Sequence, residues 1–266
     1  MVLGLAGATG CGSSGPDVFD RVLHPAPAPE GKPLLVVLHG RSGTADEILQ
    51  RSGLADAAGD TASVLAVQAL PILSGSTGWD LASPEEMDRL WTTVDGALSE
   101  TGADPDRVVL IGYSLGGMMV VRAVCDAPDR VAGMALVAGA METSLVDECA
   151  QGTTPALFFH GRADTRAPWD GTRSTLSVDE MVGFWVAANR CDPTAQTAGV
   201  PDTADWDGSI ATIHTWSDCE GGEVILFDLA DSGHAWPGSP QVQEGRTGTN
   251  MDVDASAEIV DRLSGG

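Results

Sequence analysis

Residues 108–118, with the sequence VVLIGYSLGGM, constrain the fold of this chain more than any other segment. Four apolar residues, three of them β-branched, lead directly into Gly-x-Ser-x-Gly, and a helix-like pattern follows. This order predicts a strand, a tight turn and a helix, with Ser114 raised at the apex of the turn as a candidate nucleophile. Gly112 and Gly116 would let the strand and helix approach closely, because a Cβ atom would obstruct that contact. The prediction rests on the apolar run before the pentapeptide and the helix-like pattern after it, because a chain with 33 glycines can contain the pentapeptide by chance.

Apolar runs alternate with amphipathic segments along most of the chain. The run LLVVL at 34–38 is typical of a strand buried on both faces of a parallel sheet. Further strands are predicted at 18–24, 63–69, 133–137, 156–160, 210–216 and 223–228, helices at 45–58, 84–101 and 178–189, and an acidic loop at 191–209. No shift in composition marks a boundary within 18–266, so we expect one α/β domain with a doubly wound, mostly parallel sheet.

The chain is strongly acidic, with a formal net charge of −24, a pI near 4.2 and Lys32 as its only lysine. Such a surface repels nucleic acids and anionic lipid headgroups, so we expect neither as a partner. The acidity fits a saline habitat, where salt screens self-repulsion, or simply an acidic secreted protein. No apolar run reaches the roughly 18 residues of a membrane-spanning helix.

The cysteines bear on the cellular compartment. Four of them lie in the predicted domain and permit three pairings, with buried free thiols as the alternative: Cys125, Cys149, Cys191 and Cys219. Pairing of sequence neighbours would close loops of ~25–30 residues, and each bridge would stabilise the fold by ~3 kcal/mol. Two bridges would indicate an oxidising compartment.

The fifth cysteine, Cys11, follows a small apolar stretch and precedes Gly-Ser-Ser-Gly. This resembles the end of a bacterial lipoprotein signal, although no positively charged residue precedes it. We therefore expect residues 1–17 to be a signal remnant and tether with Cys11 as the lipidation site. The protein would be secreted or held in the cell envelope.

A nucleophilic serine needs a base, and the base needs an orienting acid, in the chain order serine, acid, histidine. The chain has five histidines; two precede the serine, and His160 precedes the candidate acid. His234 follows the strand at 223–228 in a loop bracketed by glycines, which is where a base would be presented. His214 alternates with apolar residues in a predicted strand and is the weaker candidate.

Asp164 stands four residues beyond the strand at 156–160 and is the candidate acid. Asp170 and Asp179 lie further on, where a solvated surface carboxylate is the simpler interpretation. The acid would hold the imidazole tautomer and stabilise the imidazolium without taking the proton. The backbone N–H groups of Leu115, directly after the serine, and of Arg41, after the strand at 34–38, are the candidate oxyanion donors.

These segments together resemble the esterase/polyhydroxybutyrate depolymerase family of secreted α/β-hydrolases, which also includes feruloyl and acetylxylan esterases. The matching blocks are LLVVLHGRSG, GWD, IGYSLGGMMVVRAVCDAPDRVAGMALVAG, FFHGRADTRAPWDG and DSGHAWPGS, over roughly residues 34–240. The resemblance implies an α/β-hydrolase fold, the roles already given to Ser114, Asp164 and His234, and both neighbour disulfides. The chain departs from the family pattern at residues 41–43 and at Trp169, where a tyrosine is commoner.

Seven tryptophans against one tyrosine is an unusual balance. Trp79 and Trp236 fall in loops expected to converge on Ser114, where flat apolar walls would suit an aromatic acyl group or a polyester segment. We expect these two, with Trp169, to contact the substrate. Ordinary core packing is the alternative, and it is the one expected for Trp91, Trp185 and Trp216.

The combined features predict an exported, monomeric serine carboxylesterase that works through an acyl-enzyme without a metal or organic cofactor. The expected substrate is a polyhydroxyalkanoate-type polyester or its oligomers, with aryl polyesters as a promiscuous extension. A feruloyl or acetylxylan esterase and a small-ester carboxylesterase are the alternatives. A binding protein on an inactive hydrolase scaffold is a more distant one.

Overall fold

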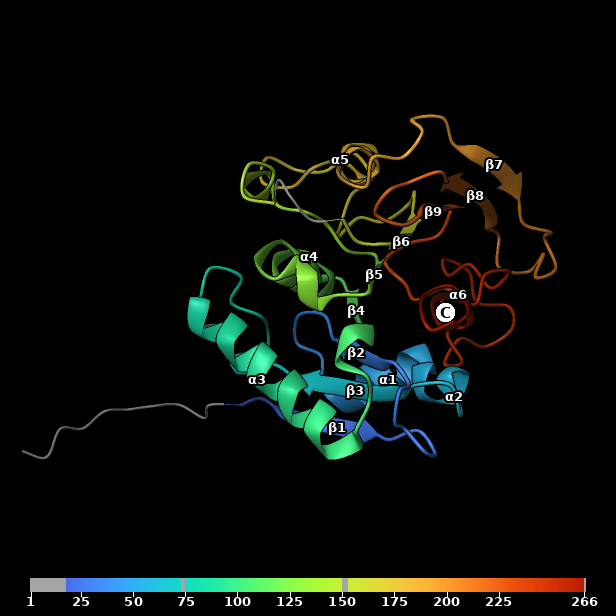
Figure 1. The fold of residues 1–266 in the computed structure, drawn as a ribbon. Helices are drawn as coiled ribbons and strands as arrows, with labels where there is room; N and C mark the ends of the chain where they lie inside the picture. Colours follow the sequence, from blue (N-terminus) through green and yellow to red (C-terminus); the bar gives the residue numbers. More distant parts are fainter. Residues whose placement is uncertain (1–17, 73–74, 150–152, 266) are drawn as a thin grey trace, which may run out of the picture.

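The computed structural model describes residues 18–72, 75–149 and 153–265 and shows one sheet between two layers of helices (Figure 1). The predicted lipidation site, Cys11, lies outside these residues. The strands are β1 Asp20–His24, β2 Leu34–Leu38, β3 Ser63–Gln68, β4 Val108–Tyr113, β5 Gly133–Val137, β6 Ala156–Gly161, β7 Gln196–Gly199, β8 Ile210–Trp216 and β9 Val224–Ala230. The helices are α1 Ala45–Ser52, α2 Leu54–Ala58, α3 Pro84–Thr101, α4 Leu115–Asp126, α5 Val178–Ala188 and α6 Ala255–Leu263.

The strand order is β1-β3-β2-β4-β5-β6-β9-β8-β7. The pairings from β3 to β9 are all parallel, whereas β1, β8 and β7 join antiparallel at the two edges. The carboxyl ends of β4, β6 and β9 therefore point to one edge of the sheet, as in other doubly wound folds. This confirms the predicted fold class and places the loops that carry the candidate site together.

The uniformly apolar strands are buried because helices cover both faces of the sheet. On β2, Leu34, Val36 and Leu38 belong to one apolar cluster with α3, α4 and α5, while Leu35 and Val37 belong to another with α1, α2 and α6. Figure 1 shows these two sets of helices on opposite sides of the sheet. A strand buried on both faces has no polar face, which explains the unbroken LLVVL run.

Four of the predicted elements need correction, and one of them is the strand predicted at 223–228, which runs from Val224 to Ala230. The helix predicted at 45–58 breaks into α1 and α2, because Gly53 adopts a left-handed conformation with φ of 65° and ends α1. The acidic segment 191–209 contains the exposed edge strand β7, which has no apolar alternation to reveal it. The predicted strand 18–24 begins at Asp20.

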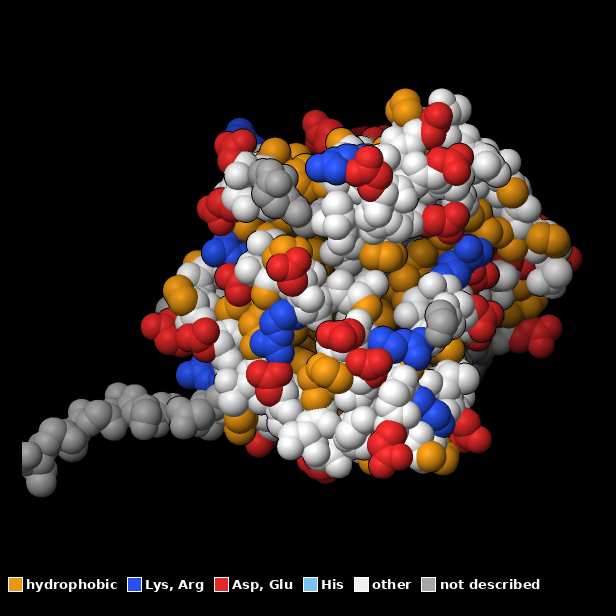
Figure 2. All heavy atoms as spheres, viewed as in Figure 1, with side chains coloured by type: hydrophobic (Ala, Val, Ile, Leu, Met, Phe, Trp, Pro, Cys, Tyr) orange, Lys and Arg blue, Asp and Glu red, His pale blue; other side chains and the backbone are white. Residues whose placement is uncertain are grey.

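The surface and the ends of the helices follow from the composition. Acidic side chains are spread over the face in Figure 2, with few basic side chains between them. Ser83, Ser177 and Asp254 begin α3, α5 and α6 by accepting hydrogen bonds from backbone N–H groups. In the described part of the chain, no helix is long and apolar enough to cross a membrane.

Two disulfides join sequence neighbours, as the resemblance implied. Cys125 at the end of α4 pairs with Cys149, and Cys191 after α5 pairs with Cys219 before β9. Each bridge attaches a helix end to an adjacent loop, closing sequence separations of 24 and 28 residues.

Removing the bridge at the end of α4 should lower stability with little change to the folded structure. The double variant Cys125→Ala/Cys149→Ala should lower the free energy of unfolding by ~3 kcal/mol, because the unfolded chain regains the entropy of a closed loop. Urea unfolding followed by circular dichroism measures this difference. An unchanged unfolding midpoint would contradict the expected contribution.

Candidate active site

Ser114 occupies a strained turn between β4 and α4. Its φ of 55° and ψ of −120° lie outside the regions that side-chain-bearing residues favour. A Cβ atom at Gly112 would lie 2.4 Å from the backbone of Gly116, and one at Gly116 would lie 2.2 Å from the carbonyl oxygen of Leu38. Both glycines are therefore required for the strand and helix to meet at this angle, which leaves the Ser114 hydroxyl at the carboxyl edge of the sheet.

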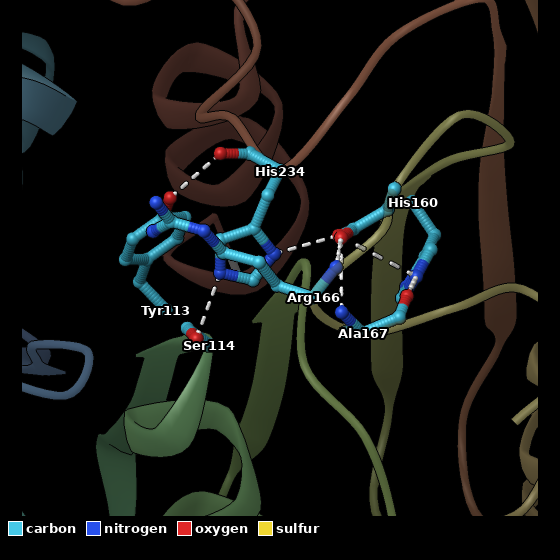
Figure 3. A network of polar contacts seen from close by, with 7 residues as sticks. Tyr113, Ser114, His160, Arg166, Ala167 and His234 are labelled. Carbon is cyan, nitrogen blue, oxygen red and sulfur yellow. Dashed lines mark hydrogen bonds and ion pairs between the residues drawn. The ribbon is translucent and has the colours of Figure 1, made fainter. Parts of the chain in front are cut away.

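The structure brings the three candidate side chains into one hydrogen-bonded chain (Figure 3). The His234 Nε2 atom lies 2.8 Å from Ser114 Oγ, and its Nδ1 atom lies 2.7 Å from Asp164 Oδ2. The three residues come from the loops after β4, β6 and β9, separated by up to 120 positions in sequence. An Nδ1–H held by the carboxylate leaves Nε2 as the acceptor for the serine proton, which is the arrangement of a general base.

Asp164 is held as a carboxylate despite its burial. Burial alone would raise its pKa, but the hydrogen bond from His234 and those from the backbone N–H groups of Ala167 and Arg166 outweigh this, so its pKa lies below the ordinary value. The two N–H groups reach Oδ1 at 2.9 and 2.8 Å, leaving Oδ2 free for the imidazole. The carboxylate is thus charged and oriented before any substrate binds.

Two aromatic side chains support this arrangement. Tyr113, the residue before the serine, donates its hydroxyl hydrogen to the carbonyl of His234 at 2.9 Å, and burial raises the pKa of the phenol. His160, on β6, lies with Nε2 2.8 Å from the carbonyl of Ala167, and burial lowers the pKa of its imidazole. A neutral His160 that donates to this carbonyl steadies the loop carrying Asp164 without adding a second charge.

The loop after β2 passes close to the serine. A Cβ atom at Gly40 would lie 3.1 Å from Ser114 Cβ, so glycine permits this approach. Among the described residues, neither the N–H of Arg41 nor that of Leu115 donates a hydrogen bond, and both residues line the cavity beside Ser114. His39 is buried below the loop, where its Nε2 accepts from the N–H of Ala69, so its role is structural.

A cavity of about 620 Å³ opens onto the serine and is called the reaction cavity below. Its apolar wall consists of Leu115, Met118, Ala138, Ala140, Ala167 and Pro168. Its polar wall includes Ser42, Arg166, Thr172 and Thr175. Small apolar side chains against a polar rim suit a substrate of modest size that carries an apolar part.

The tryptophans expected to contact substrate are instead buried in the scaffold, and none of them lines the reaction cavity. The Nε1–H of Trp79 donates to the carbonyl of His39, and that of Trp236 donates to Ser256 Oγ. Trp169 donates to Asp179 and packs under the Arg162 guanidinium, 4.0 Å from the ring centroid. A buried indole needs a partner for its N–H, and these partners lie away from the cavity.

Several residues of the site were not predicted from the sequence. Met118, one turn after the serine on α4, could have been found from helical spacing, and Arg166 from its place two residues after Asp164. Nothing in the sequence pattern marks Ala138, Ala140 or Thr175, which reach the cavity only through the sheet order. Among the described residues, no group of three or more His, Cys, Asp or Glu side chains is placed to hold a metal ion.

Comparison with known proteins identifies the family of this chain. Residues 35–253 match the family described as the Alpha/beta hydrolase family. The chain belongs to that family. NocK of Nocardia uniformis subsp. tsuyamanensis, which is assigned as an esterase, is 33% identical over 271 residues, covering 91% of this chain and 77% of its own length.

Two further similarities lie among esterases. Feruloyl esterase B of Piromyces equi is 24% identical over 216 residues, which cover 76% of this α/β-hydrolase but only 39% of the relative. The solved structure of an acetyl xylan esterase from Aspergillus awamori matches with a TM-score of 0.61 and 16% identity, covering 84% of this chain and 90% of that one. The structural match supports the fold alone.

The contact between α4 and β2 should not tolerate a methyl group. Gly116→Ala should lower the free energy of unfolding by at least about 3 kcal/mol, because the new Cβ would overlap backbone atoms that cannot rotate away. Gly183→Ala, in open space on α5, is the matched control and should stabilise by up to about 1 kcal/mol. Chemical unfolding compares them, and similar unfolding energies for the two variants would contradict the close contact.

The lowered pKa of Asp164 predicts a specific pH dependence of stability. A depressed pKa contributes stability that is present above the ordinary value of 3.8 and lost as the pH falls through the folded-state value. The free energy of unfolding of wild type should therefore exceed that of Asp164→Asn by roughly 1–3 kcal/mol near pH 7, and this difference should shrink below about pH 4. Unfolding at several pH values tests this, with Asp88→Asn on the exposed face of α3 as the control. A difference between wild type and Asp164→Asn that does not change with pH would contradict the lowered pKa of Asp164.

Proposed function

We propose that this α/β-hydrolase is a serine carboxylesterase in which Ser114 is the nucleophile, His234 the general base and Asp164 the orienting acid. The observation that carries the proposal is the continuous hydrogen-bonded chain from Ser114 Oγ through the imidazole to the Asp164 carboxylate. The strained backbone at Ser114 supports it, because such strain is costly and is found chiefly at functional sites.

The reaction follows from the positions of these atoms. His234 Nε2 takes the hydroxyl proton while Ser114 Oγ attacks the ester carbonyl carbon, and the negative charge develops on the carbonyl oxygen. The N–H groups of Leu115 and Arg41, which have no other acceptor among the described residues, stabilise that oxygen. The imidazolium then protonates the departing alcohol oxygen, leaving an acyl-enzyme. Water attacks the acyl-enzyme with His234 again as base, which releases the acid and restores Ser114.

For the substrate we propose a polyhydroxyalkanoate-type polyester or its oligomers. A reaction cavity of about 620 Å³ with a wall of aliphatic side chains suits short aliphatic hydroxyacyl units. The burial of Trp79 and Trp236 removes the aromatic walls that would favour a bulky aromatic acyl group.

A carbohydrate esterase is the second candidate. The match to feruloyl esterase B favours it, and so does the polar rim of the reaction cavity, which could donate hydrogen bonds to sugar hydroxyl groups. We further propose export from the cytoplasm, because two disulfides between neighbouring segments are characteristic of oxidising compartments.

Loss of the nucleophile tests the proposed mechanism. Ser114→Ala should lower kcat for phenyl acetate hydrolysis by a factor on the order of 10⁴–10⁶ and abolish labelling by a fluorophosphonate. Ser99→Ala, on the exposed face of α3, is the matched control and should behave as wild type. Retention of a tenth of wild-type activity by Ser114→Ala would overturn the assignment.

The substrate class is tested by a panel of esters. Soluble hydroxybutyrate oligomers, amorphous poly(3-hydroxybutyrate), methyl ferulate and acetylated xylan would be incubated with wild type and Ser114→Ala. Release of hydroxybutyrate by wild type alone supports the polyester proposal. Turnover of ferulate or acetyl esters without hydroxybutyrate release would favour the second candidate.

A further inference from the structure

A second cavity, of about 580 Å³, adjoins the reaction cavity and is called the basic cavity below. Arg41, Arg51 and Arg166 line it, together with one acidic residue, Glu47. The two cavities share lining residues, including Tyr113, His234 and two of the arginines, so a single ligand can occupy both. The basic cavity carries three positive charges and one negative charge beside the reacting groups.

Such a concentration of arginine is unexpected in a chain with a net charge of −24. Several other arginines pair with carboxylates: Arg21, Arg122, Arg130, Arg162, Arg190 and Arg262. By contrast, the side chains of Arg41, Arg51 and Arg166 form no ion pair or hydrogen bond within the described residues. Their donors are free for a ligand. Within the described residues Arg173 and Arg246 form no ion pair either, but they lie outside both cavities.

Two of these guanidinium groups are placed by their surroundings. The Arg51 guanidinium lies 5.4 Å from the centroid of the Tyr113 ring, and the Arg51 carbonyl accepts a hydrogen bond from Ser239 at 2.7 Å. Arg166 extends from the Asp164 loop past the His234 imidazole toward Tyr113 (Figure 3). Both groups therefore approach Tyr113, the residue adjoining the serine, Arg51 from the last turn of α1 and Arg166 from the loop after β6.

The basic cavity adjoins the His234 imidazole, the group that protonates the departing alcohol in the proposed mechanism. His234 lines both cavities, whereas Ser114 lines only the reaction cavity. Because the acyl group becomes bonded to Ser114 and the alcohol oxygen takes its proton from His234, the alcohol part must leave past the imidazole. An alcohol that extends from His234 into the basic cavity meets the three arginines.

We propose that the basic cavity binds a carboxylate on the alcohol part of the ester, so that the preferred substrates are esters of hydroxy acids with a free carboxyl group. The inference rests on the proposed esterase function and deepens it. Arginine suits this role because its planar fork can donate two parallel hydrogen bonds to one carboxylate. In each turnover the acyl–oxygen bond breaks, Ser114 Oγ takes the acyl group, His234 protonates the alcohol oxygen, and a hydroxy acid leaves with its carboxylate intact.

This recognition makes the free-acid end of a polyester chain the favoured point of cleavage. In a linear hydroxyacid oligomer, the last ester bond has a leaving alcohol that bears the terminal carboxylate. The enzyme would remove one unit at a time from that end. An ester whose alcohol is neutral would lack this attraction and be cleaved more slowly.

The test compares two dimers that differ only in that group. The linear 3-hydroxybutyrate dimer and its terminal carboxamide share the same scissile ester, but only the first has the anion. Wild type should cleave the acid with a kcat/KM about tenfold higher, the gain expected of a charge-assisted contact. Arg51→Gln should remove most of that preference while changing kcat/KM for the carboxamide by less than about twofold, because Arg51 lines the basic cavity but not the reaction cavity.

Two controls separate charge from structure. Arg190→Gln removes an equal charge outside both cavities and should keep the wild-type preference. Arg51→Lys retains the positive charge and should recover part of what Arg51→Gln loses. Equal rates on both dimers in wild type, or equal losses on both dimers in Arg51→Gln, would overturn the basic cavity as a carboxylate site.

Phenyl acetate separates failure of this inference from failure of the proposed function. It is a neutral ester that does not need the basic cavity, so Arg51→Gln, Arg51→Lys and Arg190→Gln should hydrolyse it as wild type does. Hydrolysis of phenyl acetate without a preference between the dimers would overturn the carboxylate site alone. Absence of phenyl acetate hydrolysis by wild type would overturn the esterase proposal and the carboxylate site with it.

Discussion

The approach of α4 to the end of β2 is the constraint on which the rest of the site depends. Glycine at position 116 brings the helix so close that a Cβ atom would lie 2.2 Å from the Leu38 carbonyl oxygen. That proximity forces Ser114 into a strained turn and brings the loop after β2 against it. The position of the half-buried Ser114 side chain therefore depends on this backbone contact, and the packing of the two apolar layers around the sheet offsets the strain.

The candidate site combines a buried carboxylate with a local group of arginines, although the chain as a whole is strongly acidic. Asp164 stays ionised in a buried position only because hydrogen bonds from His234 and two backbone N–H groups outweigh desolvation. The surrounding histidines, His39 and His160, have pKa values lowered by burial, so they add no competing charge. Against a net charge of −24, the unpaired arginines beside His234 create a local positive field, which can attract an anionic substrate that the remaining surface repels.

Much of the fold could be predicted because its elements are local. The strands at 34–38, 133–137 and 210–216 and the helix at 84–101 occur at the predicted positions, since buried strands and capped amphipathic helices leave short-range patterns. The candidate Ser114, Asp164 and His234 were found because each follows a strand whose carboxyl end lies at the same edge. The tryptophans were expected in the cleft because of their loop positions, but no short-range pattern shows which way a loop side chain points. The N–H groups of Trp79 and Trp236 donate hydrogen bonds inside the scaffold, and both side chains are buried there.

The sequence by itself determined the alternation of strands and helices, the glycines that permit the serine turn, and the order of the three polar residues, because each depends on neighbours in the chain. Only the tertiary structure decided which side chains line the reaction cavity and the basic cavity. Arg51 at the end of α1, Arg166 after β6 and Ala138 after β5 reach these two adjoining cavities because of the strand order, over separations that no periodicity records. Cavities are formed by surfaces of different elements, so their shape and charge exist only once those elements have packed.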